Sequence, residues 1–588
     1  MLTLIEETAQ TRAEHGIMNR LANALVREKL LPSAAEEDGF IQLQLNSGNV
    51  LIMNVTYKGA FSRYTFAPPF YRQKNGETYP VNTLESMLDL LAEETALKIS
   101  NDLAHELINS RDNLVLSYSQ FEQKKTWVKR QAETTIAFHK KKQPVSFIQF
   151  LKLLSECRRF DELVYSEALV IEGHPLHPST KTKLGLSKEE VLHYAPEFER
   201  EIMLKTVLVH TSLTVTSEGG KPMLYKECPA VERAAEHILS SLGEKMESYH
   251  PFLLHPWQYE HVLPQAFAAE LSERTIIPLP VEIPSSATLS FRTMALTGMN
   301  VHAKLPVNVQ ATSAVRTVSP EIAVNGPLLS ERLVPLLSSI DGLTFLPEYV
   351  GSYFGAGEKE ERSRQLSYIL RQSPSSVRRE GELLLVGASL TSDSPYNGEP
   401  VVLDIIKDHT GNEPLTAEDV YTFAHHYVER VGLPILQALL QYGAGLEAHM
   451  QNTIIAVKNG RITNVVMRDL GGVRIHQETI SHHISMDGIR DASIFSEKIE
   501  EANSKFLHAF VQNHLGDLWF TLATAVEGVE EKKLWSITSA LFRTIADEQH
   551  AIFDDYVKTK ALLSMRMNDA ASAYEYSLFQ NPLHSREG

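Results

Sequence analysis

The pattern of hydrophobic and polar positions divides the chain into three parts, and the first part mixes helix with strand. Apolar residues recur at helical spacing from Thr8 to Leu30, and residues 41–57 then alternate around Ser47-Gly48, which predicts a β-hairpin. Residues 82–140 follow mostly the pattern of amphipathic helices. We therefore expect a mixed α and β domain over residues 1–150.

The rest of the chain changes pattern near residue 390. Between residues 151 and 390, Pro residues and short β-branched runs such as KTVLVHTSLTV predict a second, mixed domain. From Thr416, whose hydroxyl can cap a helix with Asp419 three residues on, the pattern predicts a helix, a hairpin and several long helices in a third domain, residues 391–588. The fold class that we expect is therefore α+β and multidomain.

Composition narrows the classes of partner. The net charge of −17 is spread over 588 residues, which opposes attraction to nucleic acid or to an anionic membrane surface. Cys157 and Cys228 are too few for a disulfide framework, a zinc ribbon or an iron–sulfur cluster. The amino terminus lacks the basic start and apolar run of a secretory signal, and no apolar stretch approaches the roughly 20 residues that span a bilayer. We expect a soluble cytoplasmic protein that acts on small molecules.

The clearest chemical signal is the segment EAHMQNTIIAVKNGRITNVVMRDLGG, residues 447–472. Asn459-Gly460 separates two alternating β-branched runs, which is typical of a two-residue type I′ hairpin. If Lys458 faces Arg461, counting along the strands places Asn452 and Asp469 on one face at the open end.

An Asn before such a hairpin and an Asp after it are the residues by which protein kinases hold Mg²⁺ against ATP phosphates. Oxygen ligands supplied singly, with phosphate completing the shell, suit Mg²⁺. Asn452 and Asp469 are therefore candidate magnesium ligands, and His449, Gln451 and Arg468 are candidates to contact the nucleotide or the developing charge. The alternative is a surface hairpin with polar ends.

A second cluster lies in residues 285–317. Ser290, Arg292 and Thr293 offer two hydroxyls and a guanidinium group to a phosphate or carboxylate, and on a strand Ser290 and Arg292 would point to one side. Lys304 and Arg316 add two cations. A solvated strand with ordinary surface charges is the competing interpretation.

A third cluster, residues 172–190, contains the pair His174 and His177. Each His precedes a Pro, which disfavours a helix, and no third ligand lies nearby, so zinc is the weaker interpretation. With Lys181, the two histidines suit an anionic substrate gripped from a loop ahead of a helix that Ser187 caps. Histidines that bond only their own loop are the alternative. No P-loop, dinucleotide fingerprint or nucleophile elbow is found in the sequence.

These segments, in order, resemble the IucA/IucC family of siderophore synthetases that work without a peptide-synthetase assembly line. The match covers about residues 170–475 and consists of the motifs GHPLHPSTK, YAPEF, HPWQ, SFRT, HAKLPVNVQATSAVRT, EAHMQN and RDLGG. FVQNHLGDL also looks like the later helical region of the family. The resemblance implies a cupped-hand fold of thumb, fingers and palm, with a kinase-like palm, and a homodimer.

The resemblance also implies an activity: ATP activates citrate or a related carboxylate, which then passes to an amine or hydroxyl. Carried over by motif, the residues implied at the nucleotide are Ser290, Arg292, Thr293, Lys304, Arg316, His449, Gln451, Asn452 and Asp469. The residues implied at the substrate are His174, His177, Lys181, Thr312 and Arg316. Among these, the resemblance gives catalytic roles to Arg292, Lys304, Arg316, His449 and Asp469.

Two details of the motifs bear on the substrate and metal. Gly471 stands where other members often have an acidic residue, which puts a further metal ligand at that position in doubt. The run ATSAVRTVSPEIAVNGPLLS looks more like that of members accepting a citrate already amidated once.

We therefore expect a ligase that uses ATP and Mg²⁺ to adenylate citrate or a citryl monoamide and to join it to an amine such as a polyamine or diamino acid. A kinase-like phosphotransferase would use the same Asn and Asp but release ADP instead of AMP. A non-catalytic siderophore binder or reductase partner is the other alternative, although such a reductase needs cysteine ligands and the chain has only two cysteines.

Overall fold

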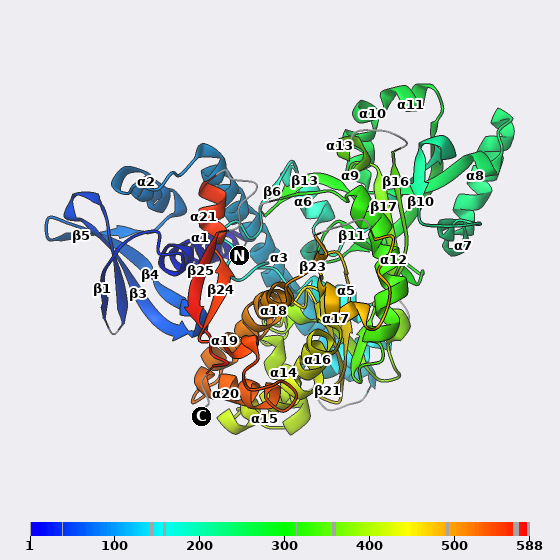
Figure 1. Ribbon diagram of the computed structural model, residues 1–588. Helices are drawn as coiled ribbons and strands as arrows, with labels where there is room; N and C mark the ends of the chain where they lie inside the picture. Colours follow the sequence, from blue (N-terminus) through cyan, green and yellow to red (C-terminus); the bar gives the residue numbers. More distant parts are fainter. Residues whose placement is uncertain are drawn as a thin grey trace.

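The computed structural model describes most of the chain, and its parts are arranged around a large mixed α/β body (Figure 1). The described residues are 2–37, 39–139, 146–156, 160–312, 314–355, 360–489, 493–568 and 575–584. Cys157, and Ser313 of the motif HAKLPVNVQATSAVRT, lie outside the described residues. Within the described residues, helices are either too short or too polar to cross a lipid bilayer.

The first part is an antiparallel sheet, in the order β1-β2-β3-β4-β5, packed against long helices. The predicted hairpin around Ser47-Gly48 is confirmed: β2 pairs with β3 across a 3-10 turn, Asn46–Gly48. The elements here are α1 (Leu2–Arg27), β1 (Ser33–Glu37), β2 (Phe40–Gln44), β3 (Val50–Gly59), β4 (Arg63–Lys74), β5 (Glu77–Val81), α2 (Leu84–Glu94) and α3 (Asn101–His139).

The middle of the chain forms an eight-stranded sheet in the order β8-β16-β17-β12-β11-β10-β7-β9. Trp257 is buried in its hydrophobic core, as expected of a core residue. The strands of this sheet are β7 (Glu201–His210), β8 (Thr214–Thr216), β9 (Tyr249–Leu254), β10 (Ile276–Ala287), β11 (Thr293–Leu296), β12 (Val301–Lys304), β16 (Glu348–Phe354) and β17 (Ser367–Gln372).

The same stretch of the chain also contains helices and small strands, and β15 and β18 form a separate four-stranded sheet with β21 (Arg461–Met467) and β20 (Thr453–Lys458). Ser187 forms the predicted capping box with Glu190. The helices are α4 (Phe147–Ser155), α5 (Glu162–Glu167), α6 (Lys188–Tyr194), α7 (Met223–Glu227), α8 (Pro229–Leu242), α9 (Pro256–His261), α10 (Leu263–Ala266), α11 (Ala268–Ser272), α12 (Pro320–Leu337) and α13 (Glu360–Ser363). The small strands are β6 (Lys183–Leu184), β13 (Val307–Ala311), β14 (Ala314–Arg316), β15 (Leu343–Phe345) and β18 (Leu383–Val386).

The last part is mostly helical, and Thr416 caps its second helix through the predicted capping box with Asp419. Its helices are α14 (Val401–Thr410), α15 (Ala417–Tyr427), α16 (Leu433–Tyr442), α17 (Gln477–Ser481), α18 (Ile499–Phe506), α19 (Gly516–Ala525), α20 (Glu531–Phe542) and α21 (Leu562–Met567), with π-helical segments η8 (Val428–Gly432) and η9 (Leu507–Leu515). Its strands are β19 (Ala444–Gly445), β20 (Thr453–Lys458), β21 (Arg461–Met467), β22 (Arg474–His476), β23 (Phe495–Ser496), β24 (Tyr556–Lys560) and β25 (Tyr576–Gln580).

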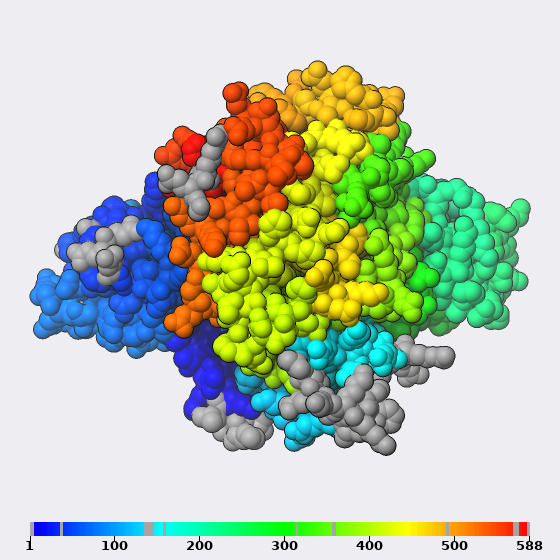
Figure 2. Space-filling model, turned by 90° about the horizontal axis from the view of Figure 1, so that it is seen from below, coloured from blue at the N-terminus to red at the C-terminus, as the bar shows by residue number. Residues whose placement is uncertain are grey.

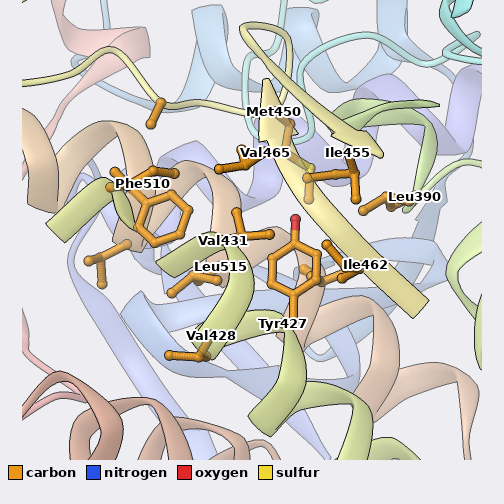
Figure 3. Close-up of a cluster of buried hydrophobic side chains, with 14 of the residues drawn as sticks. Leu390, Tyr427, Val428, Val431, Met450, Ile455, Ile462, Val465, Phe510 and Leu515 are labelled. Atoms are coloured by element: carbon orange, nitrogen blue, oxygen red, sulfur yellow. The ribbon is translucent and has the colours of Figure 1, made fainter. Parts of the chain in front are cut away.

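Seen from below, the helices of the last part occupy the middle of the molecule, between the N-terminal sheet and the helices around the eight-stranded sheet (Figure 2). Apolar side chains beneath the β20–β21 hairpin form the core of this middle region, and they include Tyr427, Met450, Val465 and Phe510 (Figure 3). The Tyr427 hydroxyl lies 2.6 Å from His514 Nε2, so the one polar tip of this side chain is bonded inside the core.

The two ends of the chain meet. The carboxylate of Glu28, which directly follows α1, accepts hydrogen bonds from the backbone N–H groups of Leu563 and Ser564, at 2.9 and 2.7 Å. The red α21 and β24–β25 hairpin accordingly lie beside the blue helices in Figure 1. The domain ranges expected from the sequence stay a prediction.

Candidate active site

A cavity of about 780 Å³ lies where segments from all three parts of the chain meet. It is lined by α1, by residues 170–183, by the turn after β10, by residues 447–451, and by η9 with the end of β24. The sequence-predicted residues that line it are His174, His177, Lys181, Ser290, Thr312, Arg316, His449 and Gln451. Segments that are far apart in the sequence therefore share one cavity. Of the other sequence-predicted residues, Arg292, Thr293, Lys304, Asn452 and Asp469 do not line it.

The β20–β21 hairpin forms as predicted, but its register is shifted by one residue. Lys458 faces Arg461, whereas Thr453, not Asn452, faces Met467, because a bulge follows Ile462. Thr463 is the extra residue, and its hydroxyl lies 2.6 Å from Glu382 Oε1. The prediction that Asn452 and Asp469 share one strand face was therefore wrong.

The open end of the hairpin nevertheless reaches the second cluster. Asp469 has a positive φ of 72°, which turns it out of the strand, and its Oδ2 accepts a hydrogen bond from Lys304 Nζ at 2.7 Å. Lys304 ends β12, where it pairs with Thr293 of β11. Burial alone would raise the pKa of Asp469, but the positive charges of Lys304, Arg371 and Arg292 hold that pKa well below its usual value. Asp469 is thus an ionised carboxylate in a strongly cationic setting.

Ser290 and Arg292 lie in a tight turn between β10 and β11, not on a strand, so the predicted strand alternation was wrong. The turn forms because the buried Phe291 adopts a positive φ of 39° and its N–H donates to Thr288 O at 2.8 Å. The Ser290 and Thr293 hydroxyls lie 3.3 Å apart. Two hydroxyls and a guanidinium group still lie close together, and it is the turn rather than strand alternation that places them there.

Two half-buried arginines, Arg292 and Arg316, carry positive charge near this turn. Arg292 contacts Thr317 O through Nη1, and burial together with the nearby Arg316 lowers the pKa of Arg292 to about 10. Arg316 Nη2 donates to Thr312 Oγ1 at 2.9 Å, and burial lowers its pKa also. Guanidinium groups crowded in this way are stabilised by a bound anion.

The His174–His177 loop is self-bonded. The Nδ1 of His174 accepts the N–H groups of Leu176 and His177, both at 3.2 Å, and His177 Nδ1 accepts that of Ser179 at 3.1 Å. Burial lowers the pKa of His177 to about 4, so its ring is neutral near pH 7. Among the described residues no group of three or more His, Cys, Asp or Glu side chains is arranged to hold a metal ion.

Lys181 and Arg468 each have a buried acidic partner. Lys181 Nζ lies 2.6 Å from the Glu197 carboxylate. Arg468 Nη1 lies 2.7 Å from Glu167, and its guanidinium group also donates to Gln451 O at 2.8 Å. Arg468 is 1% exposed and does not line the cavity, and it joins segments of the wall. The hypothesis that it contacts the nucleotide stays a prediction.

Sequence reasoning missed several lining residues. Arg12 and Arg20 of α1, Glu447, Lys505, His508 and Lys560 all line the cavity. Glu447 is the first residue of the motif EAHMQN, and His508 lies two residues before the segment FVQNHLGDL, so both lay in or next to segments already singled out. The α1 and β24 residues carried no local signal, because only the fold brings them here.

The residues present fit a magnesium ion that arrives with nucleotide phosphates. Asp469 supplies an ionised carboxylate, and Asn452 O accepts from the N–H of Arg468, the residue before Asp469, at 3.1 Å. The Asn452 side chain donates to Glu447 O at 3.3 Å, which leaves its amide oxygen for a ligand. One or two protein oxygens completed by phosphate and water are the usual magnesium shell.

Two family models match this chain. The IucA / IucC family model covers residues 162–392, and the model described as ferric iron reductase FhuF-like transporter covers residues 422–575. The first contains the turn, Lys304 and Arg316, and the second begins before the hairpin. The site thus lies across both matches.

Full-length relatives agree with the first match. Staphyloferrin A synthase of Staphylococcus aureus is 36% identical over 97% of this chain and 98% of its own length. D-ornithine--citrate ligase of the same organism is 26% identical over 97% of this chain and 92% of its own. The chain therefore belongs to the IucA/IucC family, which confirms the family and the ligase class predicted from the sequence.

The fold has a solved counterpart. The structure of ATP-bound aerobactin synthetase IucA from a hypervirulent pathotype of Klebsiella pneumoniae matches with a TM-score of 0.73, at 17% identity, over 97% of this chain and 99% of that one. At this identity the likeness shows the fold, which is the mixed α/β, multidomain fold predicted from the sequence.

Proposed function

We propose that this protein is an ATP-dependent siderophore synthetase that adenylates a carboxylate of citrate or of a citryl monoamide and condenses it with an amine. The observation that carries the proposal is the 2.7 Å pair between Lys304 and Asp469, near Arg292, which itself neighbours the cavity-lining Arg316. An ionised carboxylate among three cations suits a metal-bound triphosphate next to a carboxylate substrate. The names of the relatives, a staphyloferrin synthase and a citrate ligase, support the same substrate class.

The chemistry requires activation because an amine and a carboxylate at neutral pH form a salt. A citryl carboxylate oxygen attacks the α-phosphorus of ATP, the bond to the bridging oxygen breaks, and pyrophosphate leaves. The amine nitrogen then attacks the acyl carbon, AMP leaves with the bonding electrons, and the ammonium proton of the adduct passes to water. The cavity excludes bulk water from this mixed anhydride, and no protein nucleophile is needed.

We assign each site residue a role from where it lies. Ser290, Thr293, Arg292 and Lys304 face the phosphates, where positive charge held in place by the fold stabilises the transition state. Arg316, with Thr312, holds the carboxylate, and His449 and Gln451 complete the nucleotide side. His174 and His177 offer only their Nε2 atoms, since Nδ1 of each holds the loop, and Lys181 contributes a charge that Glu197 already balances.

Asp469 and Asn452 would hold Mg²⁺, which supplies charge neutralisation at the phosphates. Lys304 is released from Asp469 when the carboxylate takes another partner, so its ammonium group becomes available to the nucleotide. The family's cupped hand of thumb, fingers and kinase-like palm, a cytoplasmic location and a homodimer belong to the same proposal. The domain ranges 1–150, 151–390 and 391–588 go with it.

The test is a citrate-dependent exchange of labelled pyrophosphate into ATP, followed by product identification with a panel of amines. Wild-type protein should catalyse the exchange and release AMP. K304A and R316A should each reduce it by about 100-fold or more, the loss typical of removing one oriented charge. K221A is the matched control, because Lys221 is half-exposed and pairs with Glu232. Release of ADP, or full exchange by K304A with an unchanged melting temperature, would contradict the proposal.

The FhuF-like match makes a ferric siderophore reductase the second candidate. Residues 422–575 contain no cysteine, since the two cysteines of the chain are Cys157 and Cys228. A reductase with a cysteine-bound cluster therefore lacks its ligands in this segment. The match instead marks a helical fold region shared with the family.

A further inference from the structure

The backbone conformation of Thr312, on the cavity wall, is unusual for its residue type. Thr312 has a φ of 57°, in the left-handed region that β-branched residues rarely adopt. Its hydroxyl donates to Ala311 O and therefore turns a lone pair toward Arg316, whose Nη2 donates to it at 2.9 Å. Such a conformation persists only where the surrounding structure holds it. The direction of the Arg316 side chain thus depends on the residues that hold Thr312.

Two residues hold the backbone of Thr312. The Thr312 N–H donates to Thr182 O, and the Thr312 carbonyl accepts from Gln310 Nε2, both at 3.4 Å. Each of these two supports is bonded in turn to Glu106 of α3. The Thr182 hydroxyl donates to Glu106 O at 2.8 Å, and Gln310 Nε2 donates to Glu106 Oε1 at 2.7 Å. One residue of a long helix therefore holds both supports of Thr312.

Glu106 itself is fixed by the C-terminal part of the chain. It is 1% exposed, and a carboxylate at such a place needs a cation or several donors. Arg566 of α21 supplies the cation: its Nε lies 3.1 and 2.8 Å from the two carboxylate oxygens, and its Nη2 contacts Oε1. The first turn of α21 is held by Glu28, as described above. Helix α21 thus supports the cavity wall from behind, although its residues, 562–567, do not line the cavity.

The charges of this group lie around one imidazole. Burial is the main cause that lowers the pKa of His177 to about 4, and the charges of Glu106, Arg316 and Arg566 also act on the ring. The three charges are therefore close to one another. Because Arg566 compensates the Glu106 carboxylate, that carboxylate does not compete with a substrate anion for Arg316.

We infer that Glu106 is a positioning residue that directs the Arg316 guanidinium group toward the carboxylate of the donor, citrate or a citryl monoamide. Gln310 and Thr312 transmit the effect, and Arg566 keeps Glu106 in place. The inference rests on the proposed function, in which Arg316 binds that carboxylate. Loss of the support should therefore weaken the binding of the donor more than that of ATP.

The competing interpretation is that Glu106 only stabilises the fold, and kinetics separates the two. Exchange of labelled pyrophosphate into ATP is measured for Q310L, with the donor that the wild-type protein uses, and R566M and R566K form an independent pair. Q149L is the matched control, because Gln149 Nε2 donates to Asp408 Oδ1 at 2.9 Å, an amide–carboxylate bond between residues that do not line the cavity. Melting temperatures show how much stability each variant loses.

Q310L should raise the KM for the donor about 10-fold, the effect of misdirecting one charged hydrogen bond, while its KM for ATP changes less than about twofold. Q149L should change neither KM by more than about twofold. R566M should show the same rise as Q310L. R566K keeps a cation at this half-buried position and should reverse most of the rise.

The double variant Q310L/R316A tests whether Gln310 acts through Arg316. If it does, adding Q310L should lower the kcat/KM of R316A by less than about twofold, because the effects of coupled residues do not add. The inference is overturned if Q310L leaves the KM for the donor unchanged, if its full loss recurs on R316A, or if R566K is as impaired as R566M. Wild-type protein without donor-dependent exchange would instead refute the proposed function.

Discussion

The buried ion pair between Glu167 and Arg468 holds together three segments of the cavity wall. Glu167, the last residue of α5, accepts from Arg468 at 2.7 Å and from the Leu289 N–H next to the Ser290 turn. Arg468 donates in turn to Gln451 O at 2.8 Å. We predict that replacing Arg468 by Met disconnects these segments and destabilises the protein.

The expected size follows from burial. The Arg468 and Glu167 side chains are 2% and 0% exposed, and removing one partner of such a pair leaves the other charge without compensation, at about 3–5 kcal/mol. The control is R378M, since Arg378 forms a pair of the same 2.7 Å length with Glu162 on the same helix, but its side chain is 38% exposed. That variant should lose only about 1 kcal/mol.

The assay is urea and thermal denaturation of both variants, with midpoints compared because a chain of several domains need not unfold in one step. The double variant E167M/R468M should recover most of the stability, since apolar replacement of a buried pair is often neutral. It should not recover pyrophosphate exchange, because Leu289 and Gln451 remain disconnected. Equal losses in R468M and R378M, or restored exchange in the double variant, would refute this reasoning.

Two further predictions concern other carboxylates of the site. Burial raises the pKa of Glu348 to about 7 from 4.5, so the folded protein keeps a proton that the unfolded chain releases, and stability falls as pH rises across that interval. The variant E348Q should therefore flatten the pH dependence of the melting temperature, and an unchanged slope would count against this prediction. A Cβ on Gly472 would lie 2.0 Å from Glu447 Oε2, so the variant G472A should displace the Glu447 carboxylate from Lys505. The KM for substrate should change while the free energy of unfolding changes by less than about 1 kcal/mol, and unaltered kinetics would contradict this prediction.

Features set by a few adjacent residues could be predicted from the sequence. The capping boxes at Ser187 and Thr416 form because hydroxyl and carboxylate need only the right spacing within one helical turn. The hairpin at Asn459-Gly460 forms for the same reason, since both turn residues adopt positive φ. Local chemistry decided these elements, and distant parts of the chain did not override it.

Features that depend on residues far apart in the chain could not be predicted from the sequence. The bulge at Thr463 is accompanied by a hydrogen bond to Glu382, 81 residues away, and it shifts the register on which the Asn452 prediction relied. The turn at Ser290 forms because Phe291 packs into a core that no window of sequence shows. Lys505 and Lys560 look like ordinary charged residues until the fold places both at the same cavity.

The contact between Glu28 and the helix at Leu563 has a consequence for synthesis. The partners are 535 residues apart, so at the usual 5–20 residues per second α1 leaves the ribosome roughly half a minute to two minutes before its partner. During that time the half-buried carboxylate of Glu28 lacks its two backbone donors, whereas the apolar face of α1 can already pack on the N-terminal sheet and α3. The contact that joins the two ends of the chain is therefore among the last to form during synthesis.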